Sequence, residues 1–198
     1  RQKMTRNGGS ETRAAILEEA RRVLLDQGYT SLSMRSLAAA IGCTPTTIYL
    51  YFKNKDALIH TLIDEGMNML HGRLIQALEE SSEGCSIERM RALAGAYFDF
   101  GLENQEYYEV MFMLHPQHMD RYPAAKYRSA RRNLELFAEQ LPEGPSQPVV
   151  GIQIWSALHG TISLLIAQRI DNKFSRDELR DLAIEQAVAT VAARPIEN

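Results

Sequence analysis

SMRSLAAAIGCTPTTIYLYFKNK, residues 33–55, is the stretch that decides the fold of this 198-residue chain. Its apolar residues recur at helical spacing on either side of Gly42, so we expect two short helices separated by a turn. A further helix is expected to start directly after the stretch. Two short helices around a glycine-containing turn are typical of a helix-turn-helix motif.

Start and stop signals in this stretch place the helices. Ser33 is a good N-cap for the first helix, and Gly42 follows its last apolar residue, where a left-handed residue ends a helix at little steric cost. In the second helix Thr44 is the N-cap and Pro45 holds the first helical position, where its missing N–H costs nothing. Asn54 is the N-cap expected for the third helix.

The second helix has one face for the core and one that suits DNA. At about 100° per residue, Ile48 and Phe52 face inward, while Thr46, Tyr49 and Leu50 point the other way. Threonine can meet a base edge or a thymine methyl, and a tyrosine hydroxyl can reach a phosphate. A helix-turn-helix lays its second helix in the major groove, so we expect this face to contact DNA.

Two lysines, Lys53 and Lys55, flank Asn54 at the start of the third helix. A helix N-terminus is electropositive and disfavours cations, whereas a docked phosphate would remove the conflict. We therefore expect both lysines to bind DNA phosphates; the alternative is two solvated surface lysines.

The segment TIYLYFKNKDAL, residues 47–58, resembles the recognition segment of the tetracycline-repressor (TetR) family of bacterial transcription regulators. Residues 15–17 and 28–35 resemble the opening helix and turn of the same family, so the resemblance covers about the first 65 residues. It implies an all-helical chain with an N-terminal DNA-reading domain and a C-terminal ligand-binding and dimerisation domain. Taken together, the face, the caps and the resemblance predict these DNA contacts: Ser33, Arg35, Thr44, Pro45, Thr46, Thr47, Tyr49, Leu50, Tyr51, Lys53 and Lys55.

The charge distribution agrees with a DNA-reading N-terminal end. The net charge of the whole chain is −3, yet residues 1–60 carry nine Lys and Arg against five Asp and Glu. The remainder carries thirteen against twenty, so the basic end coincides with the helix-turn-helix. The acidic remainder should repel phosphate and help to orient the approach.

We expect an all-α chain of about nine helices in three parts. Residues 1–9 are polar, basic and glycine-containing and predict a flexible N-terminal arm, or a simple disordered tail. Residues 10–56 form the helix-turn-helix DNA-binding domain, and residues 57–198 form the ligand-binding and dimerisation domain. A long helix from Lys55 to about Glu80 links the two domains.

The C-terminal part of the chain predicts a homodimer through residues ~149–192. From Val149 to about Ile170 the sequence is apolar almost all round, so it is buried on two sides or spans a membrane. Polar residues interrupt the stretch, which argues against the membrane. The last helix begins with a capping box, Ser175 and Glu178. We expect these two helices to form a four-helix bundle with a second copy, or otherwise an intramolecular hairpin.

Large adaptable side chains in the C-terminal part suit a hydrophobic small-molecule effector, although such residues at helical spacing are more often core. The Trp155–His159–Gly160 arrangement resembles the Trp–His–Gly (WHG) signature of one class of C-terminal domains in the family. The predicted ligand contacts are Tyr97, Phe98, Tyr107, Met111, Trp155 and His159.

No sequence motif supports catalysis. Five scattered histidines lack cysteines or carboxylates in ligand register, and HExxH, GxSxG, P-loop and CxxC patterns are missing. We expect no enzyme, cofactor or metal site. Two cysteines without a disulfide framework and without a signal peptide favour the cytoplasm.

The sequence therefore predicts a ligand-responsive transcriptional repressor. It would bind a palindromic operator as a dimer, because one short helix reads too few base pairs, and a small, largely hydrophobic effector would release it. Two alternatives stay open: an effector-independent DNA-binding protein, and a helical small-molecule-binding protein or enzyme without DNA affinity.

Overall fold

The computed structural model describes residues 6–113, 127–171 and 173–192. Within these ranges the chain forms nine α-helices, a short 3₁₀-helix, a π-helical turn and no strand, which confirms the all-α expectation. The helices fall into two compact units. Of the described residues, 6–66 and 106–113 belong to the first unit, and 67–105, 127–171 and 173–192 belong to the second.

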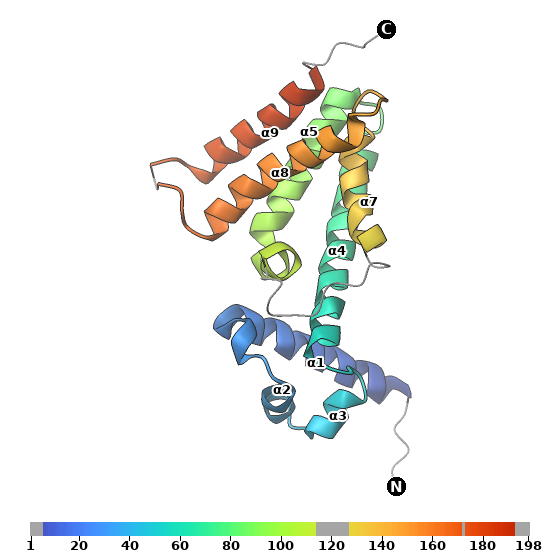
Figure 1. Cartoon of the computed structure of the whole chain (residues 1–198), viewed down its shortest axis with the longest axis vertical. Helices are drawn as coiled ribbons and strands as arrows, with labels where there is room; N and C mark the ends of the chain where they lie inside the picture. The colour runs from blue at the N-terminus through green and yellow to red at the C-terminus, as the bar shows by residue number, and fades with distance from the viewer. Residues whose placement is uncertain (1–5, 114–126, 172, 193–198) are drawn as a thin grey trace. The chain divides into compact units, whose positions relative to one another are not determined.

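The first unit contains the N-terminal helices and a later segment of the chain (Figure 1). Its elements are α1 (Arg6–Gln27), η1 (Tyr29–Ser31), α2 (Met34–Ala40), α3 (Pro45–Tyr49), the first part of α4 (Lys55–Glu80), most of α6 (Gln105–Tyr108), and η2 (Glu109–Met113). Leu58, Ile59 and Leu62 of α4 are fully or almost fully buried. The expected boundary between residues 56 and 57 therefore lies inside this unit, because the start of α4 belongs to its core.

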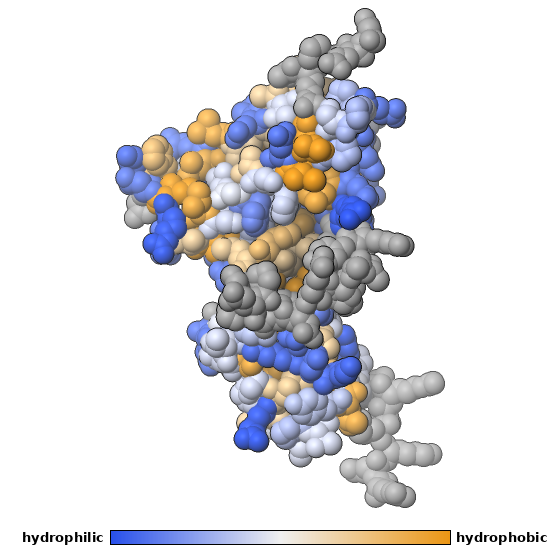
Figure 2. All heavy atoms as spheres, viewed as in Figure 1, coloured by the Kyte–Doolittle hydropathy of each residue, from blue (hydrophilic) through white to orange (hydrophobic). Residues whose placement is uncertain are grey.

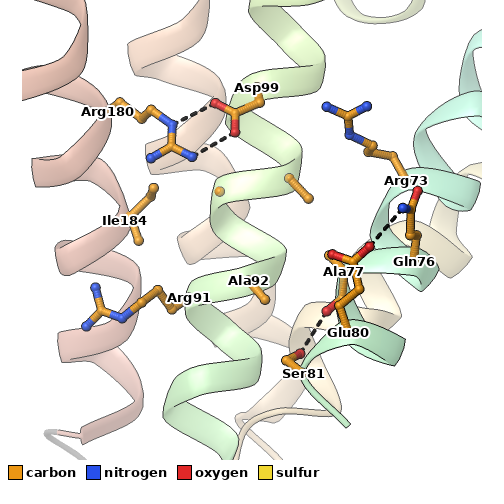
Figure 3. Close-up of a pocket in the computed structure, with 12 residues that line it drawn as sticks. Arg73, Gln76, Ala77, Glu80, Ser81, Arg91, Ala92, Asp99, Arg180 and Ile184 are labelled. Atoms are coloured by element: carbon orange, nitrogen blue, oxygen red, sulfur yellow. Dashed lines mark hydrogen bonds and ion pairs between the residues drawn. The ribbon is translucent and has the colours of Figure 1, made fainter. Parts of the chain in front are cut away.

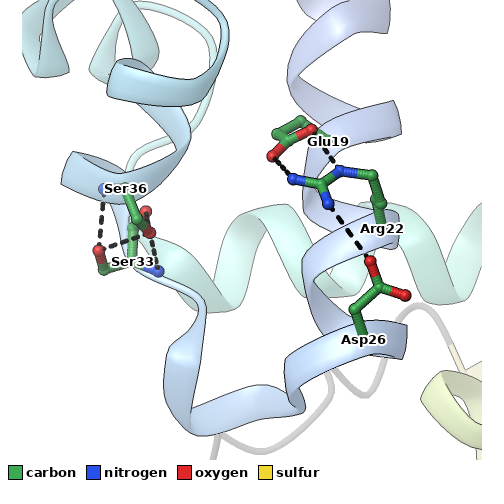
Figure 4. Close-up of polar contacts among 5 residues, drawn as sticks. All are labelled: Glu19, Arg22, Asp26, Ser33 and Ser36. Carbon is green, nitrogen blue, oxygen red and sulfur yellow. Dashed lines mark hydrogen bonds and ion pairs between the residues drawn. The ribbon is translucent and has the colours of Figure 1, made fainter.

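α1 begins at Arg6, so residues 6–9 of the expected flexible arm are helical. Residues 1–5 lie outside the described part of the chain. Gly8 and Gly9 each cost about 1 kcal/mol in a helix relative to alanine, so the local propensity favours a helix that starts after them. A helix that is already nucleated extends at little cost per residue, and this explains the longer α1. Figure 4 shows Arg22 of α1 between Glu19 and Asp26.

The predicted caps of the helix-turn-helix are present. Ser33 has extended backbone angles and accepts a hydrogen bond from the Ser36 backbone N–H, while the Ser36 hydroxyl accepts one from the Ser33 N–H (Figure 4). Gly42, which follows the C-cap Ile41 of α2, has φ +71°, the left-handed conformation that ends a helix. Thr44 caps α3, and Pro45 is its first residue. Local sequence signals therefore fix this turn.

We expect Gly28→Ala to lower the free energy of unfolding by about 1–3 kcal/mol. Gly28 has φ +76° and ψ 174°, a region that only glycine occupies without strain, and a Cβ there would meet nothing within 4 Å. The cost is thus one of backbone strain alone. Gly72→Ala is the matched control, because Gly72 lies inside α4 with open space around it and alanine should stabilise by up to about 1 kcal/mol. Urea unfolding that shifted both variants in the same direction would contradict this.

The second unit packs α5 against its other helices. It contains the rest of α4 with α5 (Ser86–Glu103), α7 (Tyr127–Ala138), α8 (Gln147–Ile166) and α9 (Arg176–Ala192). Tyr97 and Phe137 pack edge to face in its core, with ring centroids 6.0 Å apart. Asn133 is buried and satisfied, since it donates to the Met67 carbonyl and lies 2.9 Å from His71 Nδ1. The Arg180 guanidinium donates to both carboxylate oxygens of Asp99 at 2.6 and 2.7 Å.

α8 and α9 leave apolar side chains uncovered. α8 is long and apolar enough to cross a membrane by length and composition, and 28% of its most apolar window is buried inside the chain, so most of that window is uncovered. Apolar surface is visible between hydrophilic residues on this unit (Figure 2). The exposed large apolar residues of α8, α9 and the turn between them are Val149, Ile152, Leu164, Phe174 and Leu182. A helix this apolar and this exposed needs a partner in water.

Candidate nucleic-acid interface

The outward face of α3 is bare in the described structure. Tyr49 is 54% exposed and Leu50 73%, and Thr46 is exposed as well. On the opposite side Ile48 is completely buried and Phe52 is 4% exposed. The predicted facing of this helix is therefore confirmed, although α3 itself spans only Pro45–Tyr49 and continues as a turn through Tyr51.

The remaining predicted contacts around α3 have mixed surroundings. Arg35, Pro45 and Lys53 are exposed, and Tyr51 is half-buried. The hydroxyls of Thr44 and Thr47 lie 3.0 Å apart, and the Thr47 N–H donates to Thr44 Oγ1. A hydroxyl can donate and accept, so these groups, like that of Ser33, keep capacity for a further bond. In the structure Ser33 and Thr44 are the N-caps of α2 and α3.

Lys55 differs from the exposed phosphate-binding cation that the sequence suggested. Its Nζ lies 2.5 Å from the Tyr29 carbonyl oxygen and 3.4 Å from the centroid of the Tyr29 ring. Burial lowers the pKa of Lys55 below its usual range, against the smaller opposing effect of Asp56. Tyr29 is the residue that sequence reasoning missed, since no local pattern connects positions 26 residues apart.

The six predicted ligand contacts do not form one group. Tyr97 and Phe98 are fully buried in the core of the second unit. Trp155 and His159, both half-buried on α8 of the same unit, stack with ring centroids 5.1 Å apart and planes at 15°. Tyr107 and Met111 instead belong to the first unit, where both lie against Gly66.

Tyr107 has charged neighbours within the first unit. The Arg21 guanidinium lies 5.0 Å from the centroid of its ring, and its hydroxyl lies 3.5 Å from Glu65 Oε2. Burial raises the pKa of Tyr107, while the nearby Arg21 acts against this. Arg21 and Glu65 are themselves 3.7 Å apart, so Tyr107 connects α6 to α1 and α4.

The free energy of unfolding should fall as the pH drops from about 6.5, the ordinary pKa of histidine, through the lower pKa of folded His159. Burial lowers this pKa, and Ser163 Oγ lies 3.3 Å from Nε2. The unfolded chain therefore takes up the proton first, which favours unfolding at low pH. Urea unfolding between pH 8 and 5 measures the effect. His159→Gln should weaken this dependence; an identical profile in both proteins would contradict the assignment.

A polar pocket in the second unit was not foreseen from the sequence. It has a volume of about 620 Å³ and lies between α4, α5 and α9 (Figure 3). Arg180 and Asp99 pair at its wall, and Arg91 pairs with Glu185 nearby. None of the six predicted ligand contacts lines it. No sequence signal could have found it, because its residues come from three separate helices. The described residues contain no group of three or more His, Cys, Asp or Glu placed to hold a metal.

Comparisons with known proteins agree with this geometry. The model of "Bacterial regulatory proteins, tetR family" matches residues 16–62, and that of "Tetracyclin repressor-like, C-terminal domain" matches residues 90–187. The HTH-type transcriptional regulator TtgR of Pseudomonas putida is 33% identical over 89 residues. That alignment covers 45% of this chain and 42% of TtgR, so the chain spans less than half of this relative.

Two solved structures have the same fold. A bacterial regulatory protein in the tetR family from Rhodococcus RHA1 has a TM-score of 0.69 at 18% identity, covering 91% of this chain and 97% of that one. A TetR family transcription regulator from Marinobacter aquaeolei VT8 has a TM-score of 0.65 at 21% identity, covering 94% and 98%. At these identities the likeness concerns the fold alone.

A helix-turn-helix with a bare outward face, followed by a helical C-terminal unit, is the architecture of a helix-turn-helix regulatory protein. Both family models match parts of the chain that lie in order and together cover most of it. The chain belongs to the tetR family of bacterial regulatory proteins.

Proposed function

We propose that this protein is a transcriptional repressor that binds a palindromic operator as a homodimer and leaves it when a small effector binds. The observation that carries the proposal is the bare face of α3, where Thr46, Tyr49 and Leu50 are exposed over a buried Ile48 and Phe52. Tyr49 at the end of α3 and Leu50 directly after it are both more than half exposed, and large apolar surfaces gain nothing from water. Against a major groove they meet bases, methyl groups and phosphates.

The proposed contact surface consists of the exposed or half-buried predicted residues on α2 and α3 and in the turn after α3. Arg35 and Lys53 supply cations for phosphates, and Thr46, Tyr49 and Leu50 face the bases. The other members are Ser33, Thr44, Pro45, Thr47 and Tyr51. The basic balance of residues 1–60 adds an attraction that does not depend on sequence. A DNA target would place the protein in the cytoplasm.

Selection from a random pool of duplexes tests the proposal. The wild-type protein should enrich a palindrome whose half-sites are about one helical turn apart, and should bind it in gel shifts at moderate salt. Repeating the selection over increasing salt separates sequence-specific binding from the general attraction for phosphate. Enrichment of no sequence over several rounds would reject the proposal.

The dimer rests on the uncovered apolar side of α8 and α9. Val149, Ile152 and Leu164 of α8 and Leu182 of α9 are each about half exposed or more in the single chain. A second copy placed on these helices would make a four-helix bundle and remove this surface from water. A membrane would also cover it, so light scattering without detergent is the discriminating measurement.

The proposed effector is a small, largely hydrophobic molecule. The stacked, half-buried pair Trp155 and His159 gives a flat apolar surface, which suits a largely hydrophobic molecule. Their place in a WHG-type arrangement with Gly160 remains an expectation. A contact to Tyr107 or Met111 would act on the first unit directly. Mass spectrometry of the native protein for co-purified small molecules tests this part.

An effector-independent DNA-binding protein is the second candidate, and one observation favours it. Tyr97 and Phe98, expected to line the effector site, are 1% and 0% exposed, with Tyr97 packed on Phe137. A filled core leaves no room for a ligand at these two residues. An enzyme is not proposed, because regulators of this family are typically non-enzymatic.

A further inference from the structure

Small residues on α5 create the polar pocket of the second unit. Ala92, Gly95 and Ala96 follow one another at spacings of three and one along α5, so they share one broad face of that helix, and all three line the pocket. Ala77 lines it from α4. Side chains this short leave a space of about 620 Å³ where α5 runs between α4 and α9 (Figure 3). All lining residues belong to the second unit, so the pocket lies within one compact unit.

Two exposed arginines line this pocket from different helices, and each holds a carboxylate at the surface. Arg73 of α4 donates to Glu103 at 3.0 Å, and Arg91 of α5 pairs with Glu185. The four side chains are between 46% and 58% exposed, and neither glutamate lines the pocket. Ion pairs this exposed contribute little to stability. Both glutamates can therefore return to water at small cost, which frees the two guanidiniums for another carboxylate.

A third arginine, Arg180 of α9, is held more firmly. Its guanidinium donates to both Asp99 oxygens at 2.6 and 2.7 Å, and the two side chains are about one third exposed. This pair adds no net charge to the pocket. The other charged lining residues are Arg73, Arg91 and Glu80, two positive and one negative, so the lining has a net charge of +1. The pocket therefore favours an anion.

We propose that this pocket binds a small organic anion with two or three carboxylates, which take the places of the surface glutamates on Arg73 and Arg91. A planar carboxylate matches the fork of a guanidinium, as the bidentate pair of Arg180 and Asp99 shows in the same pocket. Two arginines on different helices call for more than one carboxylate on the ligand.

The remaining lining suits the carbon skeleton of such a molecule. Ile184 of α9 is 5% exposed and, together with the alanines of α4 and α5, gives the pocket apolar surface between its charged groups. The pocket does not include Trp155 or His159, the residues proposed for a hydrophobic effector. The inference therefore goes beyond the proposed function and does not depend on DNA binding.

Calorimetric titration of the full chain without DNA tests the inference. The probes are citrate, glutarate and valerate, which carry three, two and one carboxylates, at constant ionic strength and about pH 7.5, where the carboxylates are ionised. Citrate should bind with a dissociation constant of about 0.1–1 mM, and valerate at least about tenfold more weakly. No citrate binding at about 10 mM, or equal binding of citrate and valerate, would overturn the inference.

Arg73→Gln and Arg91→Gln locate the site, and each should weaken citrate binding about tenfold without changing the melting curve by circular dichroism. Arg22→Gln is the matched control, because Arg22 is 55% exposed and paired with Glu19 but lies on α1, outside the pocket. It should bind citrate as the wild-type protein does.

An equal loss in all three variants would show a general attraction of the protein for anions, and undiminished binding by Arg73→Gln and Arg91→Gln would place citrate elsewhere. Either result would overturn the inference. Because no DNA is present in these titrations, neither result would bear on the proposed repressor function.

Discussion

Leu182→Arg is expected to make the protein monomeric and to weaken operator binding about 100-fold or more. Leu182 lies on α9 and is 67% exposed in the single chain, on the side that α8 and α9 leave uncovered. In the proposed dimer this leucine is buried, and an unpaired arginine there would lose its hydration without a partner. A monomer reads only one half-site, so the gain from binding two linked half-sites disappears.

Met69→Arg is the matched control for this prediction. Met69 is also an exposed apolar residue, 44% exposed, but it lies on α4, outside the proposed interface. Both variants add one positive charge, which by itself strengthens DNA binding slightly. Light scattering and gel shifts should find Met69→Arg dimeric and active. A Leu182→Arg protein that stays dimeric in water would show that the two copies meet elsewhere.

Tyr49→Ala is expected to reduce operator affinity by about 10–100-fold while the free energy of unfolding changes by no more than about 0.5 kcal/mol. Tyr49 is 54% exposed, so its removal leaves no cavity. In a dimer the contact is lost twice, once in each half-site. Gel shifts with the selected duplex measure the first quantity, and urea unfolding followed by circular dichroism measures the second.

Ile48→Ala in the same helix should behave in the opposite way. Ile48 is completely buried, so its truncation should lower the free energy of unfolding by about 2–5 kcal/mol. Under conditions where the Ile48→Ala protein is folded, it should bind DNA, and any loss of binding should be proportional to the loss of folded protein. If Tyr49→Ala instead unfolded the protein as Ile48→Ala does, the assigned facing of α3 would be wrong.

The helix-turn-helix was predictable because its signals are local. Ser33, Gly42, Thr44 and Asn54 each act on backbone groups a few residues away, and each takes the predicted part in the structure. The bounds of α4 were also correct, Lys55–Glu80, because its buried leucines recur over many turns. The start of α1 was misjudged, since glycine propensity there is weaker than the gain from extending a long helix.

The ligand residues were the least predictable part of the candidate site. Tyr97, Tyr107 and Trp155 share a residue class and helical spacing, and nothing local distinguishes core from pocket. The structure puts Tyr97 in the core, Tyr107 beside Arg21 in the first unit, and Trp155 against His159. Such assignments depend on which helices pack together, and therefore on contacts between residues far apart in the chain.

The sequence alone determined the helical class, the turn at Gly42 and the exposed face of α3, because caps, glycines and helical periodicity act within one or two turns. Tertiary structure decided that Lys55 contacts Tyr29 while Lys53 is exposed to water. It also decided that Arg73, Arg91 and Arg180 line one pocket. It also decided which apolar residues of α8 stay uncovered. These outcomes come from packing between distant segments, where a side chain's partners are set by the whole fold rather than by its neighbours in sequence.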